Sequence, residues 1–484
     1  MAEGEEILPD IGSFSVAGGL LSAALGILAA GHAVMFKRDP RSATIWVLSV
    51  LLVPVLGAAA YVLFGINRVN RKAQHIRYAP DPGAGIPSNE EVLSPLPGDL
   101  AGLARLVETV SAKDLTNGNS CRPLDGGSQA YPRMLEAIGQ ARHSIALASY
   151  IFENKGIGEE FVNALVAAHE RGVDVKILID DVYVRMSFSD AYGPLRAAGL
   201  DVALFNPPII PARLHSVNLR NHRKLLIVDG TLGFTGGMNI HSPYWRPEAP
   251  ESAMRDLHFE LRGPVLEHLR QTFARDWLDS ADTRLEREFW RLDSRQDRPA
   301  NERVLARGVE SGPDETLDRM RWVFMGAINA ARTRICIRTP YFLPDQPMIA
   351  AISAAALRGV EVDIVVPENS DHKFVKWASQ AHYWQILEHG ARIHERSGPF
   401  DHSKLMLVDS TWVCLGSANW DARSLRLNFE FNVELYDEFL AQKLKDGFDA
   451  VLKESRQVRA DELMQLPVAA RLRNGIARLF APIL

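Results

Sequence analysis

The sequence predicts an α/β protein made of two pseudo-symmetric half-domains, preceded by an N-terminal two-helix transmembrane hairpin. Three observations lead to this prediction: two nearly uncharged apolar runs close to the start, strand-like segments that alternate with helical ones, and a motif that occurs twice. The chain of 484 residues is too long for one ordinary domain. With 47% hydrophobic and 23% charged residues its composition is globular, which excludes the disordered and collagen-like classes.

The apolar runs cover residues 14–36 and 43–66, and neither contains Lys, Arg, Asp or Glu. As helices rising 1.5 Å per residue, they would each extend about 35 Å, enough to cross a hydrocarbon core of roughly 30 Å. We therefore expect a transmembrane hairpin over residues 14–66, with two buried core helices as the alternative. A cleaved signal peptide is disfavoured because the first ten residues are acidic. Three basic residues in the connector against four after the second run leave the membrane orientation open.

The body is expected to divide into two halves after a proline-rich linker over residues 67–100. Residues 144–152 and 334–342 are strand-like, as are residues 172–179 and 359–366, and this alternation with Ala-rich helical segments is typical of α/β units. The predicted segments after the linker are a first half at 101–284, a charged linker at 285–314, a second half at 315–462 and a C-terminal amphipathic segment at 463–484. This last segment could lie on an anionic membrane surface or pack on the body as a helix.

The most informative feature is a pattern of His, Lys, Asp and Asn that recurs after 180 positions. Successive side chains of a strand point to opposite faces, so each His and Lys, two residues apart, share one face. Asp followed by Gly or Ser predicts a hairpin turn, and the small residues after it leave room for a ligand near the imidazole. The two copies are His222-x-Lys224-x4-Asp229 with Gly236-Gly237-x-Asn239, and His402-x-Lys404-x4-Asp409 with Gly416-Ser417-x-Asn419.

This double pattern resembles the phospholipase D superfamily, in which two half-sites meet and act on a phosphodiester. Further segments resemble bacterial cardiolipin synthases: the hairpin ending at residues 61–68, and residues 150–152, 311–314, 339–345 and 423–430. The resemblance covers nearly the whole chain. It implies two phospholipase D-like α/β/α half-domains and phosphatidyl transfer that requires neither a metal nor another cofactor.

The resemblance also implies the role of each site residue. His222 is expected to be the nucleophile that forms a phosphohistidine, and His402 the general acid; the pseudo-symmetric sequence alone leaves this choice open. Lys224 and Lys404 would supply positive charge. The remaining expected roles are phosphate binding by Asn239 and Asn419, orientation of the imidazoles by Glu430 and Glu260, and structural support at the turns by Asp229 and Asp409.

The expected reaction transfers a phosphatidyl group from one phosphatidylglycerol to another, with release of glycerol. The expected partners are phosphatidylglycerol and anionic membrane lipids, and no nucleic acid, since 54 Lys and Arg against 59 Asp and Glu give a net charge of -5. Three widely separated cysteines, Cys121, Cys336 and Cys414, indicate reduced thiols and a cytoplasmic body. The resemblance implies a multi-pass protein of the bacterial inner membrane. A membrane-bound phospholipase D acting on other phospholipids, and an inactive membrane scaffold, remain alternatives; the oligomeric state is open.

Overall fold

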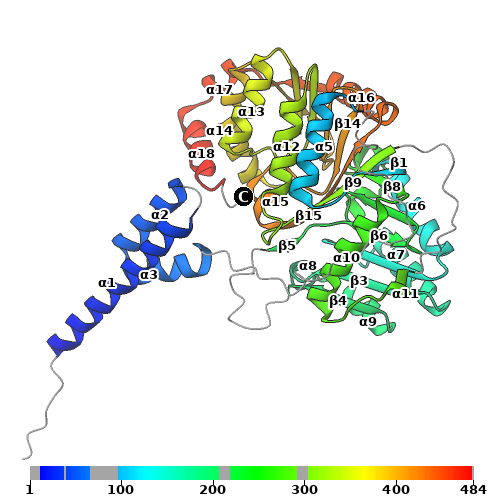
Figure 1. Cartoon of the computed structure of the whole chain (residues 1–484), viewed down its shortest axis with the longest axis horizontal. Helices are drawn as coiled ribbons and strands as arrows, with labels where there is room; N and C mark the ends of the chain where they lie inside the picture. The colour runs from blue at the N-terminus through cyan, green and yellow to red at the C-terminus, as the bar shows by residue number, and fades with distance from the viewer. Residues whose placement is uncertain (1–10, 38–39, 66–95, 207–218, 291–303, 482–484) are drawn as a thin grey trace, which may run out of the picture. The chain divides into compact units, whose positions relative to one another are not determined.

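The computed structural model describes residues 11–37, 40–65, 96–206, 219–290 and 304–481 (Figure 1). These residues divide into two compact units, an N-terminal one that ends before residue 71 and a body that follows it. Most of the expected linker at 67–100 lies outside the described residues.

The N-terminal unit is a helical hairpin in which α1 (Ile11–Phe36) packs on α2 (Pro40–Leu52) and α3 (Pro54–Ala60), with a π-turn at Tyr61–Gly65. Among the described residues, one helical stretch, Gly19–Phe36, is long and apolar enough to cross a membrane. The second expected span is not one continuous helix. Pro54 lacks the N–H that would continue the α2 ladder, and Val53 before it adopts φ −135° and ψ 75°.

The body confirms the α/β prediction and its internal symmetry. In the part of the chain that the structure describes, sixteen strands form one sheet, fifteen of them in the order β16-β12-β11-β10-β13-β14-β15-β9-β1-β8-β7-β6-β2-β3-β4, with β5 paired to β15. Counted outward from the central antiparallel pair β9–β1, β15, β14, β13, β10, β11 and β12 correspond to β8, β7, β6, β2, β3 and β4, and β16 extends the second half beyond this match, so the two halves are related across this pair.

The strands of the first half are β1 (Thr116–Asp125), β2 (Ser144–Ser149), β3 (Asp174–Asp180), β4 (Asp201–Phe205), β5 (Arg220–Asn221), β6 (Leu225–Val228), β7 (Leu232–Gly236) and β8 (Leu257–Arg262). Those of the second half are β9 (Val304–Ser311), β10 (Arg334–Arg338), β11 (Glu361–Pro367), β12 (Arg392–Arg396), β13 (Leu405–Val408), β14 (Trp412–Gly416), β15 (Asn428–Tyr436) and β16 (Ser455–Gln457).

Helices cover both faces of the sheet. In the second half Val362 and Ile364 of β11 face a core that includes α12 and α13, whereas Asp363 between them faces Arg334, which also pairs with Asp449 of α16. The main helices are α5 (Gly98–Ser111), α6 (Gly126–Gln140), α7 (Ile157–Glu170), α10 (Leu266–Ala281), α12 (Arg319–Ala330), α13 (Gln346–Leu357), α14 (Lys373–Leu387), α16 (Glu438–Lys453) and α18 (Val468–Leu479). Short ones are α8 (Asp181–Met186), α9 (Tyr192–Ala197), α11 (Arg287–Trp290), α15 (Ala422–Arg426), α17 (Ala460–Gln465) and 3-10 turns at Ser242–Tyr244 and Pro250–Ser252.

Two segments depart from the expected division of the body. The expected linker at 285–314 contains α11 and the whole of β9, a central strand with Val309 buried, and only residues 291–303 of it lie outside the described residues. Helix α5 falls mostly within the expected first half, yet Leu103 and Val107 belong to the core of the second half. The chain therefore crosses between the halves before the first motif is reached.

The motif aspartates lie at the hairpin turns that join β6 to β7 and β13 to β14, as the sequence predicts. Asp229 and Asp409 have φ of 49° and 53°, a left-handed conformation that short polar residues tolerate. The Asp229 carboxylate accepts hydrogen bonds from the backbone N–H groups of residues 142–144, and that of Asp409 from residues 332–334. Each carboxylate ties its turn to the start of the adjacent strand.

Asp409→Asn tests this anchor, because asparagine keeps the shape and the left-handed tolerance of aspartate but loses the negative charge. We expect a loss of about 1–2 kcal/mol of stability, measured as a lower midpoint of thermal unfolding in detergent. The matched control is Asp446→Asn, since this exposed carboxylate accepts a side-chain hydrogen bond from Gln442, at 2.7 Å, and no backbone bond among the described residues. Equal midpoints for the two variants would contradict the role of Asp409.

Candidate active site

The backbone of each motif histidine is held by backbone of the opposite half. The His222 N–H donates to the carbonyl of Phe429 at 2.9 Å, which extends the parallel pairing of β5 with β15. In the other half the His402 N–H donates to the carbonyl of Arg255 at 2.8 Å. Both imidazoles are buried, and their ring centroids lie 6.4 Å apart with the planes at 80°. The backbone thus brings residues 180 positions apart into one site.

A carboxylate from the opposite half contacts Nδ1 of each imidazole. Glu430 Oε2 lies 3.0 Å from His222 Nδ1, and Asp256 Oδ2 lies 2.9 Å from His402 Nδ1. Each acid directly follows the residue whose carbonyl holds the histidine backbone. Since an imidazole that donates Nδ1–H to a carboxylate keeps its other nitrogen unprotonated, this contact fixes the tautomer and directs Nε2 to a substrate.

Glu260 was expected to orient a histidine, and the structure places it elsewhere. Its carboxylate pairs with Arg133 at 2.7 Å, outside the histidine pair. The sheet register shows why: Gly236 lies opposite His258 and Gly416 opposite Asn432, so the counterpart of Glu430 is Asp256 and that of Glu260 is Glu434. The sequence carries this signal, because Asp256-x3-Glu260-Leu261 recurs as Glu430-x3-Glu434-Leu435.

The two carboxylates have different surroundings. Glu430 accepts a hydrogen bond from Ser417 Oγ at 2.5 Å and another from Asn428 Nδ2 at 3.1 Å. Gly237 occupies the position of Ser417 in the first half, where a Cβ atom would collide with the Asp256 carboxylate. Asp256 instead accepts from the N–H of Leu257 at 2.8 Å, through its other oxygen. One residue of the repeat therefore gives Glu430 a hydroxyl donor that Asp256 lacks.

These surroundings shift the pKa values of the two acids in opposite directions. Burial raises the pKa of Asp256 to about 7, although Lys404 opposes this. Burial would also raise the pKa of Glu430, but His222 and Lys224 outweigh it and hold the pKa below its usual value. Burial lowers the pKa of His222, opposed by Glu430, and lowers that of His402 further, with Lys404 acting in the same direction. These shifts favour the neutral form of both imidazoles and the ionised form of Glu430.

The motif lysines bring buried positive charge to the same site. Lys224 Nζ donates to the carbonyl of His222 at 2.7 Å, and Lys404 Nζ makes the equivalent bond to His402. Burial lowers the pKa of Lys224 to about 7 and that of Lys404 to about 8, even though Glu430 and Asp256 oppose these shifts. An anion between the two ammonium groups would restore their charge.

The asparagines and several aromatic rings complete the wall of the site. Asn239 Oδ1 accepts from the N–H of Ile151 at 3.3 Å, and Asn419 Oδ1 is buried without a hydrogen-bond partner among the described residues. The Tyr150 ring lies 5.4 Å from that of His222, and the Tyr244 hydroxyl lies 3.0 Å from His402 Nδ1. Neither tyrosine belongs to the repeated motif.

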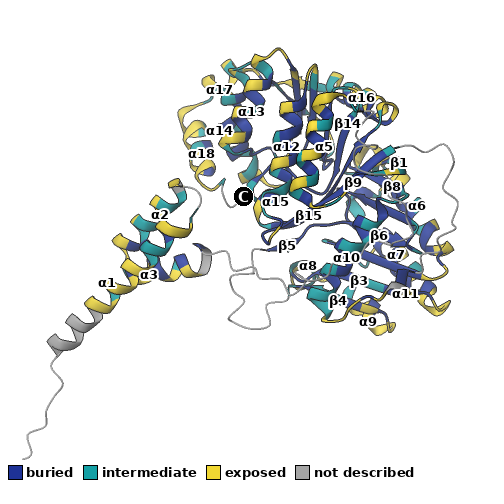
Figure 2. Cartoon of the chain, viewed as in Figure 1, coloured by how far each residue is buried: buried dark blue, intermediate teal, exposed yellow. Residues whose placement is uncertain are grey.

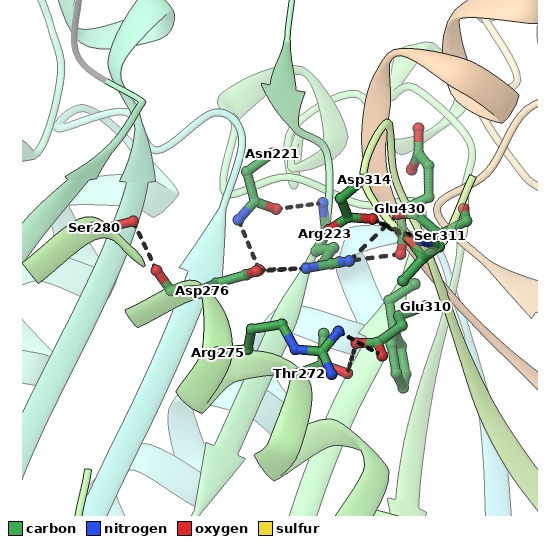
Figure 3. Close-up of polar contacts among 12 residues, drawn as sticks. Asn221, Arg223, Thr272, Arg275, Asp276, Ser280, Glu310, Ser311, Asp314 and Glu430 are labelled. Atoms are coloured by element: carbon green, nitrogen blue, oxygen red, sulfur yellow. Dashed lines mark hydrogen bonds and ion pairs between the residues drawn. The ribbon is translucent and has the colours of Figure 1, made fainter. Parts of the chain in front are cut away.

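Arg223, between the first motif His and Lys, fastens the two halves behind the histidines. Figure 3 shows its guanidinium lying between Asp276 of α10 and the backbone of β9 and β15. It contacts both Asp276 oxygens, at 2.6 and 2.7 Å, and donates to the carbonyls of Glu430 and Ser311. Because Arg223 is fully buried, this ion pair through Nη1, together with the bonds to the two carbonyls, fixes the backbone that carries both His222 and Glu430.

Asp256→Asn and Glu260→Gln distinguish the acid that the structure places on His402 from the one expected from the sequence. We expect Asp256→Asn to lower phospholipid turnover by about 10- to 100-fold, because the imidazole loses its orienting anion. Glu260→Gln should leave turnover unchanged. Initial rates are measured in detergent, and thermal unfolding checks that both variants fold. The reverse order of activities would refute the assignment.

Comparison with known proteins agrees with this geometry. The family model "Cardiolipin synthase, PLD-like domain" matches residues 134–277 and 324–452, and "Phospholipase D-nuclease N-terminal" matches residues 24–65. A cardiolipin synthase of Alkalihalophilus pseudofirmus is 30% identical over 95% of this chain and 92% of its own length. The major cardiolipin synthase of Bacillus subtilis is 32% identical over 93% and 96%.

Among solved structures, phosphatidylserine synthase from Haemophilus influenzae matches with a TM-score of 0.62 at 14% identity, over 79% of this chain and all of its own, which shows a shared fold. Family models that cover more than half of the sequence and relatives of at least 30% identity along nearly all of it lead to one conclusion. The chain belongs to the cardiolipin synthase family of phospholipase D-like proteins.

Proposed function

We propose that this protein makes cardiolipin by transferring the phosphatidyl group of one phosphatidylglycerol to another, through a phosphohistidine on His222. The observation that carries the proposal is the pair of buried imidazoles, 6.4 Å apart, with each Nδ1 bound to a carboxylate. One phosphoryl group fits between two Nε2 atoms oriented in this way, and family membership supports the lipid substrate.

In the first step His222 Nε2 attacks phosphorus, and the bond from phosphorus to the oxygen of the headgroup glycerol breaks. His402 donates a proton to that oxygen, and glycerol leaves. In the second step His402 removes the proton from the terminal hydroxyl of another phosphatidylglycerol. The resulting oxygen attacks phosphorus, the N–P bond breaks, and His222 is released. A proton transferred out in one half-reaction returns in the other, so one histidine acts as acid and then as base.

The difference between the two carboxylates supports His222 as the nucleophile. An ionised partner raises the basicity of an imidazole, and Glu430 has the lowered pKa and the Ser417 hydroxyl donor. His402, beside an acid with a pKa of about 7, suits proton exchange. Binding of the negative phosphodiester raises the pKa of His402, which prepares it to act as the acid.

The lysines and asparagines stabilise the charge that builds on the non-bridging oxygens. Lys224 and Lys404 supply buried positive charge, which acts strongly because little water screens it. The NH2 groups of Asn239 and Asn419 donate to the same oxygens. No resident metal has a part in these steps.

The proposal places the enzyme in the inner membrane of a bacterium as a multi-pass protein, with the catalytic body in the cytoplasm. The apolar stretch Gly19–Phe36 supports one span, and the α2–α3 segment supplies the return span despite its break at Pro54. The net charge of -5 disfavours nucleic acid as a partner, and family membership supports lipid.

The test supplies phosphatidylglycerol vesicles to the full chain and follows its lipid products. We expect cardiolipin and free glycerol in equal amounts, and, in acid-quenched reactions with phosphate-labelled lipid, label on His222. Free phosphatidic acid without cardiolipin would identify a phospholipase D, and label on His402 would reverse the two roles. Full turnover in His222→Ala would refute the proposed chemistry altogether.

The lysine pKa values predict how activity depends on pH. The ammonium form binds phosphate and is lost as the pH rises through the pKa, so kcat/KM should decline between about pH 7 and pH 8. It should also decline in acid, below the ordinary imidazole pKa of 6.5, since His222 must be neutral to attack. Initial rates across pH, at low and saturating lipid, measure both limbs.

Bound lipid should move the alkaline limb of kcat to higher pH, because the diester charge favours the ammonium form. In Lys404→Arg the ionisation with the higher pKa should disappear from the alkaline limb, since a guanidinium stays charged. An alkaline limb that stays near pH 10 in kcat/KM would show that the lysines are not perturbed as described.

A further inference from the structure

The helix α18 carries its large apolar side chains on the face turned away from the body. Val468 is 72% exposed, Leu472 64% and Leu479 74%, whereas Asn474 and Ala477 are buried against α14 (Figure 2). Asn474 Nδ2 donates to Gln380 Oε1 of α14 at 3.3 Å. The structure thus shows the packed alternative for this amphipathic segment, with its polar side inward.

This orientation is the reverse of that in an ordinary surface helix. With 3.6 residues per turn, Val468, Leu472, Ile476 and Leu479 fall within an arc of roughly 80°, opposite the buried pair. A helix of a soluble protein buries such a stripe in its own core. Here the stripe is continued by exposed Met464 in α17.

Basic residues flank the apolar stripe on both sides. Arg471 and Arg478 lie on one flank and Arg473 on the other, and all three are exposed. The Arg473 guanidinium also lies 4.4 Å from the centre of the Trp377 ring of α14. The helix contains no Asp or Glu. An apolar stripe bordered by arginines is complementary to an anionic bilayer, in which acyl chains lie beneath phosphate groups.

The end of α18 lies next to the start of α14, in the half that carries His402. Phe480, which follows α18, contacts Phe374 near the start of α14, with ring centroids 5.6 Å apart. Two residues before Phe374, His372 lies 5.8 Å from the ring of Tyr341, which lies 6.3 Å from that of Phe400. The Phe400 ring is 6.0 Å from His402. Through the chain around residues 372–374, the end of α18 is thus connected to the rings near His402.

We propose that α18 docks the body onto the surface of an anionic bilayer, with Val468, Leu472, Ile476 and Leu479 inserted among the acyl chains and the flanking arginines at the headgroup phosphates. This contact is separate from the N-terminal helices and goes beyond the transfer chemistry. It holds the half that carries His402 against the membrane that contains the lipid substrate.

The test measures depth directly and does not require turnover, so its outcome is independent of the proposed reaction. The full chain with Cys121→Ser, whose other two cysteines are buried, is labelled at Leu472→Cys with a polarity-sensitive fluorophore. It is reconstituted into phosphatidylcholine vesicles containing phosphatidylglycerol and a lipid-borne quencher. The matched control carries the label at Phe439→Cys, an 81% exposed position on α16.

We expect blue-shifted emission and lipid quenching at position 472, and quenching by aqueous iodide at position 439. Equal iodide quenching at both positions would overturn the proposal. Protection at 472 from both quenchers would also overturn it, because it would mean that protein, a second copy of the chain or its own N-terminal helices, covers the stripe.

A second experiment tests the electrostatic part. Arg471→Gln with Arg478→Gln should weaken lipid quenching at position 472 at low salt and reduce its dependence on ionic strength. Leu472→Gln with Ile476→Gln should raise the KM for vesicle lipid several-fold while kcat on dissolved short-chain phosphatidylglycerol stays constant. An unchanged KM in the second variant would show that the stripe does not serve substrate access.

Discussion

The active site depends on one constraint: each histidine needs a carboxylate that the other half of the chain supplies. Glu430 holds His222 and Asp256 holds His402, and the backbone next to each acid also receives the N–H of the histidine. The central β1–β9 pair sets the halves at the distance that these contacts require. Arg223 stabilises this arrangement through its ion pair with Asp276. The relative position of the two imidazoles is therefore set by the contacts between the halves.

Pseudo-symmetry gives the site two similar imidazoles, and the different surroundings of their carboxylates distinguish them. Ser417 donates to Glu430, whereas Gly237 leaves Asp256 without a hydroxyl donor, and the pKa values of the acids move in opposite directions. The nucleophilic histidine needs a partner carboxylate that stays ionised. The histidine that donates and regains a proton needs a partner carboxylate whose pKa lies close to neutral pH. The two requirements of the proposed reaction are thereby separated within one duplicated motif.

Local features were predictable from the sequence because short-range rules determine them. The hairpins after His222 and His402 follow from turn residues and alternation, and the repeat predicted two matching halves. The carboxylate pairing was not predictable from one motif, since it depends on strand register across the join. Alignment of Asp256 with Glu430 would have corrected the choice of Glu260. Because residues 285–314 are rich in charged side chains, they were expected to form a linker, although they contain β9. Hydropathy alone does not predict the helix break at Pro54.

Helix α5 has a consequence for how such a chain is assembled. It precedes the first motif in sequence but packs in the core of the second half, and Arg307 of β9 donates to the carbonyl of Ala104 within α5 at 2.7 Å and to that of Lys113 just after it at 3.0 Å. This helix is synthesised before the first half, yet the core that it completes forms only when the second half has been made. The two halves therefore cannot each fold to completion in the order in which they are synthesised.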